Sequence, residues 1–264
     1  MLKKLLKYDL LWKLKIIAVF CCLGFIFFTL GMLLSLIKDS VIFSIITGIF
    51  KGACVAMFAN ALFNSLFTSW ARNVSNLYKD ESYLTHTLPV TKNELLASKV
   101  LSQTILIVAT GTLLILSIFA MYINKDVFES LKTLIQFTSE ALNTSVAMLL
   151  ITFLLLVLLE LLFIAFCGNF GIIFGHRFNK YKTLKSVIYA ILAYFIQNAI
   201  ILIILLFVSI FDKGMYNLFF TGAAVVDYSS LMITAYICIG AYLVSGIALY
   251  ILTNKIFNKG VNVD

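Results

Sequence analysis

The sequence predicts an all-α integral membrane protein with six transmembrane helices and both termini in the cytoplasm. Three observations lead to this prediction: the composition, six long apolar stretches, and an unequal distribution of basic residues. Of the 264 residues, 62% are hydrophobic and 12% are charged, and the mean hydropathy is +1.05. A soluble globular domain is about half apolar and about a quarter charged. The composition therefore excludes a soluble enzyme domain, a disordered chain and a disulfide scaffold.

A helix that crosses a bilayer needs about 20 predominantly apolar residues. Six stretches meet this requirement, and together they predict a single transmembrane domain over residues 1–264. The only proline, Pro89, lies outside all six, so the spans are expected to be free of proline kinks. The predicted spans are 16–37, 41–68, 99–123, 146–174, 186–211 and 230–252.

The basic residues indicate how the chain is oriented. With the N-terminus inside, 15 of the 20 Lys and Arg flank the inner ends of the spans, four flank the outer ends, and Lys51 lies within a span. Because basic residues collect on the cytoplasmic side of a membrane, both termini are predicted to be cytoplasmic. The same asymmetry accounts for the net charge of +8, so no nucleic-acid partner is expected.

Residues 1–15, MLKKLLKYDLLWKLK, precede the first span and carry an amphipathic pattern. We expect an interfacial helix on the inner leaflet, with its lysines toward anionic headgroups. A basic flank that only orients the first span is the alternative. At helical spacing, one face carries Met1, Leu2, Leu5, Leu6, Tyr8 and Trp12, the opposite face carries Lys3, Lys4, Lys7 and Lys15, and Asp9 and Lys13 interrupt the apolar face.

The three outer loops differ in kind. The first, around residues 38–40, is predicted to be a tight turn. The second, 124–145, has apolar residues at three-to-four spacing and predicts a short surface helix. The third, 212–229, contains an apolar run at 215–226 that is too short to span and too apolar for a free loop. We therefore expect a short re-entrant or interfacial segment in the last outer loop.

The cytoplasmic loop over residues 69–98 is long and patterned. Pro89 disfavours helix at Leu88, and Thr91 followed by Glu94 forms a capping-box pattern. These signals predict a short helix that ends near Leu88 and a second helix that starts after Thr91 and continues into the third span. Apolar side chains beside this break, such as Leu84, indicate a docking surface. An elbow that packs on its own helix ends is an equal alternative.

The string YLTHTLPVT at 83–91, followed by LLASK at 95–99, resembles the cytoplasmic loop of bacterial ABC-2-type ABC transporter permeases. The resemblance implies a permease subunit of an ATP-driven exporter in the bacterial plasma membrane. Such a chain has no cofactor or ATPase site of its own, and no G-x-x-x-x-G-K-S/T motif occurs here. ATP and Mg²⁺ would be held by a separate ABC ATPase subunit, and the permease would pair with a second copy or a paralogue.

The resemblance also implies that the loop over 76–99 couples this chain to the ATPase through a coupling helix. The positions that match this helix include two acidic residues before the YLT string and the residues around the proline. The implied coupling residues are Asp80, Glu81, Tyr83, Leu84, Thr87, Leu88, Pro89 and Val90.

Two charged residues fall within the spans, Lys51 in the second and Glu160 in the fourth. Because a charge in the membrane is costly, each is expected to face a partner or a cavity. They could pair with each other or line a substrate path. Alternatively, Lys51 snorkels outward and a protonated Glu160 packs against a neighbouring helix. Four further polar residues at membrane depth are expected to donate hydrogen bonds between helices: Asn60, Asn64, Gln197 and Asn198.

The sequence predicts no catalytic residue and no metal site. Neither histidine belongs to an HExxH motif, and the five cysteines lie in apolar runs without metal-ligand spacing. Gly171 and Gly175 are best explained by close helix packing. An ATPase-independent secondary transporter or a membrane scaffold or immunity protein remains an alternative function. A secondary transporter would favour internal repeats and clustered midplane charges, and only Lys51 and Glu160 stand out.

Overall fold

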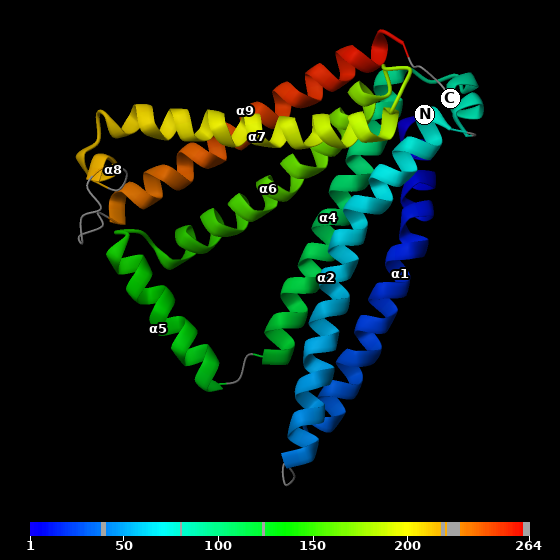
Figure 1. The fold of residues 1–264 in the computed structure, drawn as a ribbon. Helices are drawn as coiled ribbons and strands as arrows, with labels where there is room; N and C mark the ends of the chain where they lie inside the picture. Colours follow the sequence, from blue (N-terminus) through cyan, green and yellow to red (C-terminus); the bar gives the residue numbers. More distant parts are fainter. Residues whose placement is uncertain (38–40, 80, 123–124, 218–219, 221–227, 261–264) are drawn as a thin grey trace. The chain divides into compact units, whose positions relative to one another are not determined.

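A computed structural model of the chain describes residues 1–37, 41–79, 81–122, 125–217, 220 and 228–260. Within this part of the chain the structure is helical and contains no β-strand. Six of its helices are long and apolar enough to cross a membrane (Figure 1). The predicted all-α class and the predicted number of spans are therefore confirmed. By packing, the chain divides into two compact units, Met1–Phe128 and Glu129–Asn262, and each is described by itself.

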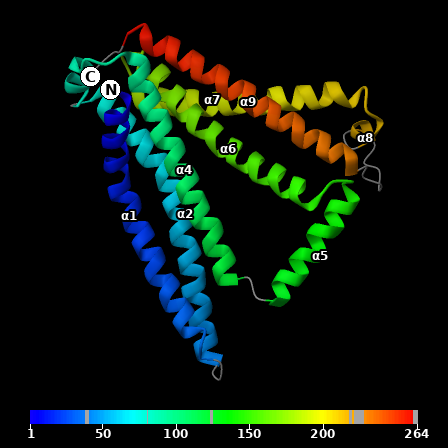
Figure 2. The same cartoon turned by 180° about the vertical axis from the view of Figure 1, so that it is seen from behind.

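Unit 1 is built from three long helices and one short one. Helices α1 (Leu2–Leu34), α2 (Val41–Tyr78) and α4 (Lys92–Tyr122) pack against one another in pairs and run side by side (Figures 1 and 2). The short helix α3 (Ser82–Thr87) packs on α2. The apolar core of the three long helices includes Ile17, Cys54, Phe58, Ala61, Leu106 and Met121.

Unit 2 is built around α6 (Val146–Gly175), which packs on α7 (Lys182–Ser209) and on α9 (Tyr228–Asn258). The short helix α8 (Lys213–Tyr216) contacts α7 and α9. Met215 anchors α8 because its side chain is buried in one cluster with Ile201 and Leu205 of α7. Helix α5 (Lys125–Ala141) carries the boundary between the two units, and it confirms the surface helix predicted over 124–145.

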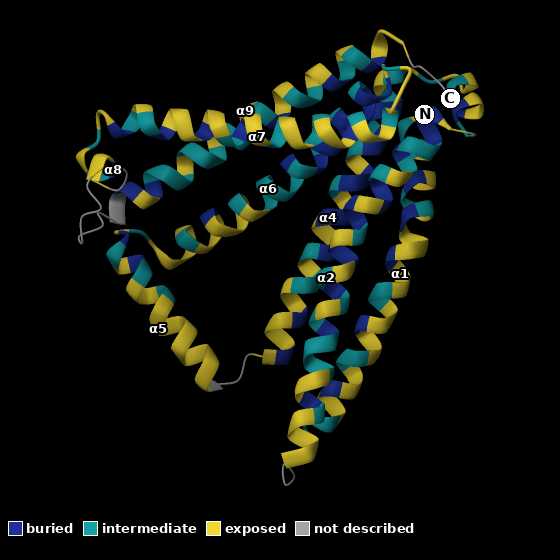
Figure 3. Cartoon of the chain, in the orientation of Figure 1, coloured by how far each residue is buried: buried dark blue, intermediate teal, exposed yellow. Residues whose placement is uncertain are grey.

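Exposed residues lie along much of the length of the long helices (Figure 3), and many of them are large and apolar. In the most apolar window of each spanning helix, at most 28% of the residues are buried within the chain. Large residues such as Val19, Phe63 and Ile203 are exposed on α1, α2 and α7. A soluble protein rarely exposes contiguous apolar surface of this extent. These faces therefore need an apolar solvent, as expected for a multi-pass membrane protein.

The N-terminal segment differs from the prediction of a separate interfacial helix. Residues 1–15 are the first half of one continuous helix, α1, which runs on into the first span. The residues that interrupt the apolar face, Asp9 and Lys13, are buried, whereas Tyr8 is exposed. The two faces of the helical pattern are kept: Leu2, Leu5, Leu6 and Trp12 are half-buried, and the four lysines of the opposite face are exposed. The pattern did not show that Asp9 and Lys13, on the packed face, have polar partners on α4.

The break predicted in the cytoplasmic loop is confirmed, but the loop is shorter than 69–98. Helix α2 continues to Tyr78, so residues 69–78 are helical. Helix α3 then ends at Thr87, and Leu88 adopts an extended conformation at φ −64°, ψ 140°. The capping box is also confirmed: Thr91 Oγ1 accepts from the Glu94 backbone N–H at 3.2 Å, and Glu94 Oε2 accepts from the Thr91 N–H at 3.3 Å. Helix α4 begins at Lys92.

Two outer-loop predictions concern residues that the structure describes only in part or not at all. The predicted turn at 38–40 lies wholly outside the described residues. Of the segment 215–226, only the residues around α8 and Phe220 are described. The re-entrant segment therefore stays a prediction.

The close helix packing predicted at Gly171 and Gly175 is confirmed. A Cβ added at Gly171 would collide with the Ser186 carbonyl oxygen and would lie 2.7 Å from Ala190 Cβ. A Cβ at Gly175 would collide with the Ser186 backbone nitrogen. The two glycines thus let α6 and α7 approach until their backbones touch. His176 caps α6: its Nδ1 donates to the Ile172 carbonyl of the same helix at 2.8 Å, and Ser186 Oγ of α7 lies 3.2 Å from this nitrogen.

Candidate functional site

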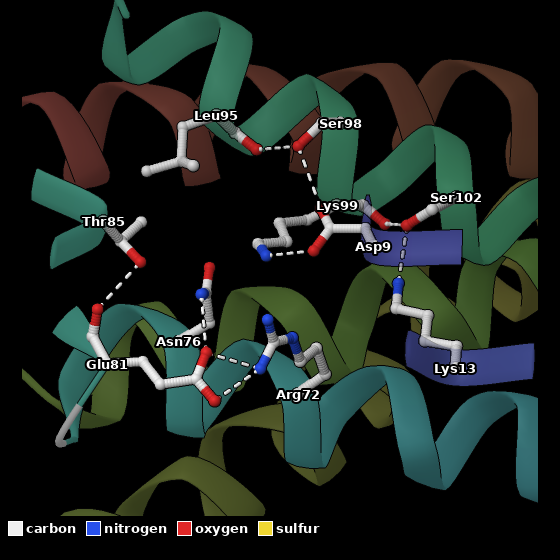
Figure 4. A network of polar contacts seen from close by, with 10 residues as sticks. All are labelled: Asp9, Lys13, Arg72, Asn76, Glu81, Thr85, Leu95, Ser98, Lys99 and Ser102. Carbon is white, nitrogen blue, oxygen red and sulfur yellow. Dashed lines mark hydrogen bonds and ion pairs between the residues drawn. The ribbon is translucent and has the colours of Figure 1, made fainter. Parts of the chain in front are cut away.

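A network of polar and charged side chains joins α1, α2 and α4 at the end of unit 1 that carries α3 (Figure 4). Each helix supplies residues about one turn apart, because residues four apart lie on the same helix face. Helix α1 contributes Asp9 and Lys13, and α2 contributes Arg72 and Asn76. Helix α4 contributes Ser98, Lys99 and Ser102, and Glu81 precedes α3.

The most deeply buried contact is the ion pair between α1 and α4. Lys99 Nζ lies 2.5 Å from Asp9 Oδ1, and both side chains are almost fully excluded from solvent. Ser98 Oγ donates a second hydrogen bond to Asp9 at 3.1 Å. A buried charge is tolerated only when it is paired and hydrogen-bonded. The Asp9–Lys99 pair therefore requires α1 and α4 to stay in register.

A second ion pair joins α2 to the start of α3. Arg72 Nη1 lies 2.6 Å from Glu81 Oε1 and 2.5 Å from Oε2, and Asn76 Nδ2 donates to Oε2 at 3.1 Å. The Arg72 guanidinium also stacks over the Trp12 ring of α1, 4.8 Å from its centroid. Burial acts to raise the pKa of Glu81, but the hydrogen bonds from Asn76 and Arg72 and the Arg72 charge hold this pKa below its ordinary value.

Helix α3 has an anchored face and an exposed face. On the anchored face Ser82 and Thr85 are buried, and His86 Nε2 donates to the Leu77 carbonyl of α2 at 3.1 Å. On the other face Tyr83 is 67% exposed and Leu84 is 75% exposed. The result is a short helix that is fastened to α2 on one side and presents apolar side chains to its surroundings on the other.

The structure places most of the sequence-predicted coupling residues on or next to α3. Tyr83, Leu84, Thr87, Leu88 and Pro89 are exposed there, and Val90 is half-buried. Glu81 lies on the anchored side instead, because its carboxylate is bound by Arg72 and Asn76. Asp80 lies outside the described residues.

Sequence reasoning missed most of the buried network. Lys13 was expected only as an interruption of the apolar face, and Lys99 only as the end of the LLASK string, yet both are buried. One signal was available: Asp9 is the only acidic residue among the first 38, in a segment rich in lysine. A single acid in a basic amphipathic segment indicates a specific partner. Which residue this partner is depends on which helix packs against Asp9.

The polar residues at membrane depth do not bridge helices as expected. Asn60, Asn64 and Asn198 each donate, at 2.9 Å, to the carbonyl four residues earlier in their own helix. The prediction of interhelical hydrogen bonds is therefore wrong for these three donors. An asparagine in an apolar helix can satisfy its amide locally, because the carbonyl one turn back is within reach.

The predictions for Glu160, Gln197 and Lys51, the other residues at this depth, differ in how they compare with the structure. Tyr194 Oη donates to Glu160 Oε1 at 3.2 Å, which joins α7 to α6. Gln197 is buried, and its Nε2 makes no hydrogen bond to the part of the chain that the structure describes. Lys51 belongs to unit 1 and packs its stem beside Gly31, whereas Glu160 belongs to unit 2. The Lys51–Glu160 pair stays a prediction.

Replacing Glu81 by Gln is expected to lower the free energy of unfolding by about 0.5–1 kcal/mol at neutral pH, because its side chain is 42% exposed and solvent weakens the ion pair. The lowered pKa means that this stabilisation is present at neutral pH and is lost as the pH falls through the folded-state pKa, below the ordinary value of 4.5. Thermal unfolding in detergent at several pH values measures both effects.

Glu140→Gln, at an exposed position on α5, is the matched control. An unchanged difference between Glu81→Gln and wild type at acid pH would contradict the assignment.

No family model, no curated protein and no solved structure matches the chain. The functional argument therefore rests on the geometry of unit 1. Two ion pairs and a cation–π contact connect α1, α2, α4 and the start of α3. Such an arrangement is suited to carrying a displacement from one helix to the others.

Proposed function

We propose that this chain is the permease subunit of an ATP-driven exporter of the ABC-2 type in a bacterial plasma membrane. In this proposal the spans form the substrate path, and two permease copies or a pair of paralogues assemble around it. A separate ABC ATPase binds ATP and Mg²⁺ and carries out hydrolysis. The contact with that ATPase is made by α3 and the residues around Pro89.

The observation that carries this proposal is the exposed apolar face of α3. Tyr83 and Leu84 lie on a short helix between two long ones, and Leu88 follows directly after it, on the side predicted to face the cytoplasm. Exposed apolar side chains on a well-anchored element favour a protein-docking surface. The resemblance of 83–91 and 95–99 to the permease loop supports the choice of an ATPase as the partner.

The anchored face of α3 supports a mechanical role. A push on α3 by the ATPase reaches α2 through the Glu81–Arg72 ion pair and the His86–Leu77 hydrogen bond. Arg72 contacts Trp12 on α1, and Asp9 on α1 is bound to Lys99 on α4. Movement of α3 would therefore be shared by the three long helices of unit 1 rather than absorbed in a loose loop.

Replacing Leu84 by Asp is expected to abolish co-purification of the ATPase and to abolish transport, because a charge would occupy the centre of an apolar contact. Folding should be unaffected, since Leu84 is 75% exposed in the chain itself. The measurement is affinity purification in mild detergent from the native host, followed by mass spectrometry of the bound proteins. A stoichiometric ABC ATPase with the wild-type chain is the expected result.

Tyr181→Asp is the matched control, because Tyr181 is equally exposed, at 75%, on another loop predicted to be cytoplasmic. Its left-handed backbone, at φ 57°, tolerates Asp better than most residues. This control should retain the ATPase. Recovery of the wild-type chain alone from several detergents, or full ATPase binding by Leu84→Asp, would contradict the proposal and favour a secondary transporter or a scaffold.

A further inference from the structure

Lys13 is buried in the network, and no carboxylate of the described residues pairs with it. Its side chain is 0% exposed, and its Nζ donates to Ser102 Oγ at 2.6 Å. Ser102 Oγ in turn donates to the Lys99 carbonyl at 3.0 Å. Among the residues that the structure describes, Lys13 takes part in no ion pair. A hydroxyl oxygen is a weak partner for a buried ammonium group.

The charged groups that face Lys13 come from all three long helices. Asp9 lies one turn earlier on α1, but its carboxylate is bound by Lys99 and Ser98 of α4. Lys99 and Arg72, the latter from α2, bring two further positive charges. The second carboxylate, Glu81, is bound by Arg72. The network thus offers three cations and two carboxylates, and Lys13 is the cation left over.

A buried ammonium without a counter-charge is unstable, because desolvation disfavours the charged form. A neutral amine avoids this cost and still donates a hydrogen bond to Ser102. Lys13 precedes the apolar span that begins at residue 16. Burial lowers the pKa of Lys13 to about 7, against the raising effect of Asp9 and with the further lowering effects of Lys99 and Arg72.

We infer that Lys13 is a proton-binding site: its amine is neutral while α1 is packed on α4, and it takes up a proton when the two helices separate. Separation brings Lys13 into water, where a lysine amine is protonated at neutral pH. A lower cytoplasmic pH would therefore favour the separated arrangement. This inference does not depend on the proposed exporter function, because it follows from the α1–α4 contact alone.

The test is the pH dependence of unfolding for the full chain in detergent micelles. A lowered folded-state pKa means that the unfolded chain binds one more proton, so stability rises with pH between the two pKa values. We expect the unfolding equilibrium constant of the wild type to fall about tenfold per pH unit between about pH 7 and about pH 9. Lys13→Met is expected to lack this slope and to be more stable than the wild type at pH about 7.

Lys15→Met is the matched control, because Lys15 is exposed two residues further along the same helix. It should keep the wild-type slope. Lys13→Arg keeps its charge at every pH, so it should lack the slope and be the least stable variant at high pH. A wild-type slope in Lys13→Met would overturn the inference.

A second readout needs no variant and remains decisive if the Lys13 variants fail to fold. Spectra of the wild-type chain labelled with ¹⁵N-lysine report the protonation of each side-chain amine. One amine is expected to titrate near pH 7, well below the exposed lysines. Titration of every lysine above about pH 9, near the ordinary value, would overturn the inference.

Discussion

Replacing Asp9 by Ala is expected to lower the free energy of unfolding by about 3–5 kcal/mol. The substitution removes the acceptor of both Lys99 Nζ and Ser98 Oγ. Lys99 would then be buried beside Lys13 and Arg72 with no counter-charge on α1. A buried ion pair that loses one partner costs far more than the pair contributed, because the remaining charge stays desolvated. Denaturation of the full chain in mixed micelles measures the loss.

Glu129→Ala, at an exposed position on α5, is the control for loss of a carboxylate and should change stability by less than about 0.5 kcal/mol. The double variant Asp9→Leu with Lys99→Leu should recover most of the stability, because two apolar side chains replace two buried charges. A double variant that is no more stable than Asp9→Ala would contradict the pairing. So would a loss in Asp9→Ala no larger than in the control.

Replacing Gly171 or Gly175 by Ala is expected to destabilise the α6–α7 pair by about 1–3 kcal/mol or more. At Gly175 the new Cβ would lie 2.6 Å from Ser186 Cα, and at Gly171 it would lie 2.8 Å from the Ala190 backbone nitrogen. Backbone atoms cannot move aside as a flexible side chain can. The two helices would have to separate, which would also weaken the contacts of His176 with Ser186.

The same Gly→Ala substitution has the opposite expected sign at Gly111 and Gly240, where an added Cβ would meet no atom of another described helix within 4 Å. At these helical positions Ala is favoured over Gly by about 0.5–1 kcal/mol, because it loses less backbone freedom on folding. Thermal unfolding of the four single variants in one detergent gives the comparison. Equal effects at all four positions would contradict the close approach of α6 and α7.

The helices of this protein follow from local features of the sequence. The composition and the six apolar stretches predicted the six spanning helices, because each stretch is long enough to cross a bilayer by itself. The break at Leu88 and the start of α4 were predicted for a similar reason. Pro89 and the Thr91–Glu94 capping box act within a few residues of their own positions.

The buried network could not be predicted in the same way. Asp9 and Lys99 are 90 positions apart in the sequence, and Lys13 and Ser102 are 89 apart. A hydropathy pattern shows that a lysine lies at the end of a span, but not whether it faces water or another helix. The helical wheel of residues 1–15 showed Asp9 and Lys13 as interruptions of an apolar face, but it could not show that α4 supplies their polar partners.

The sequence by itself determined the class of this protein, the number of helices able to span a membrane, the break at Leu88 and the start of α4. These properties depend only on nearby residues and on the surrounding solvent, so each can be predicted from one segment of the sequence. The tertiary structure decided which charged residues are buried, which of them meet, and that none of the described carboxylates pairs with Lys13. Those properties depend on which helix faces which, and side chains from three helices at once set the balance of desolvation and pairing.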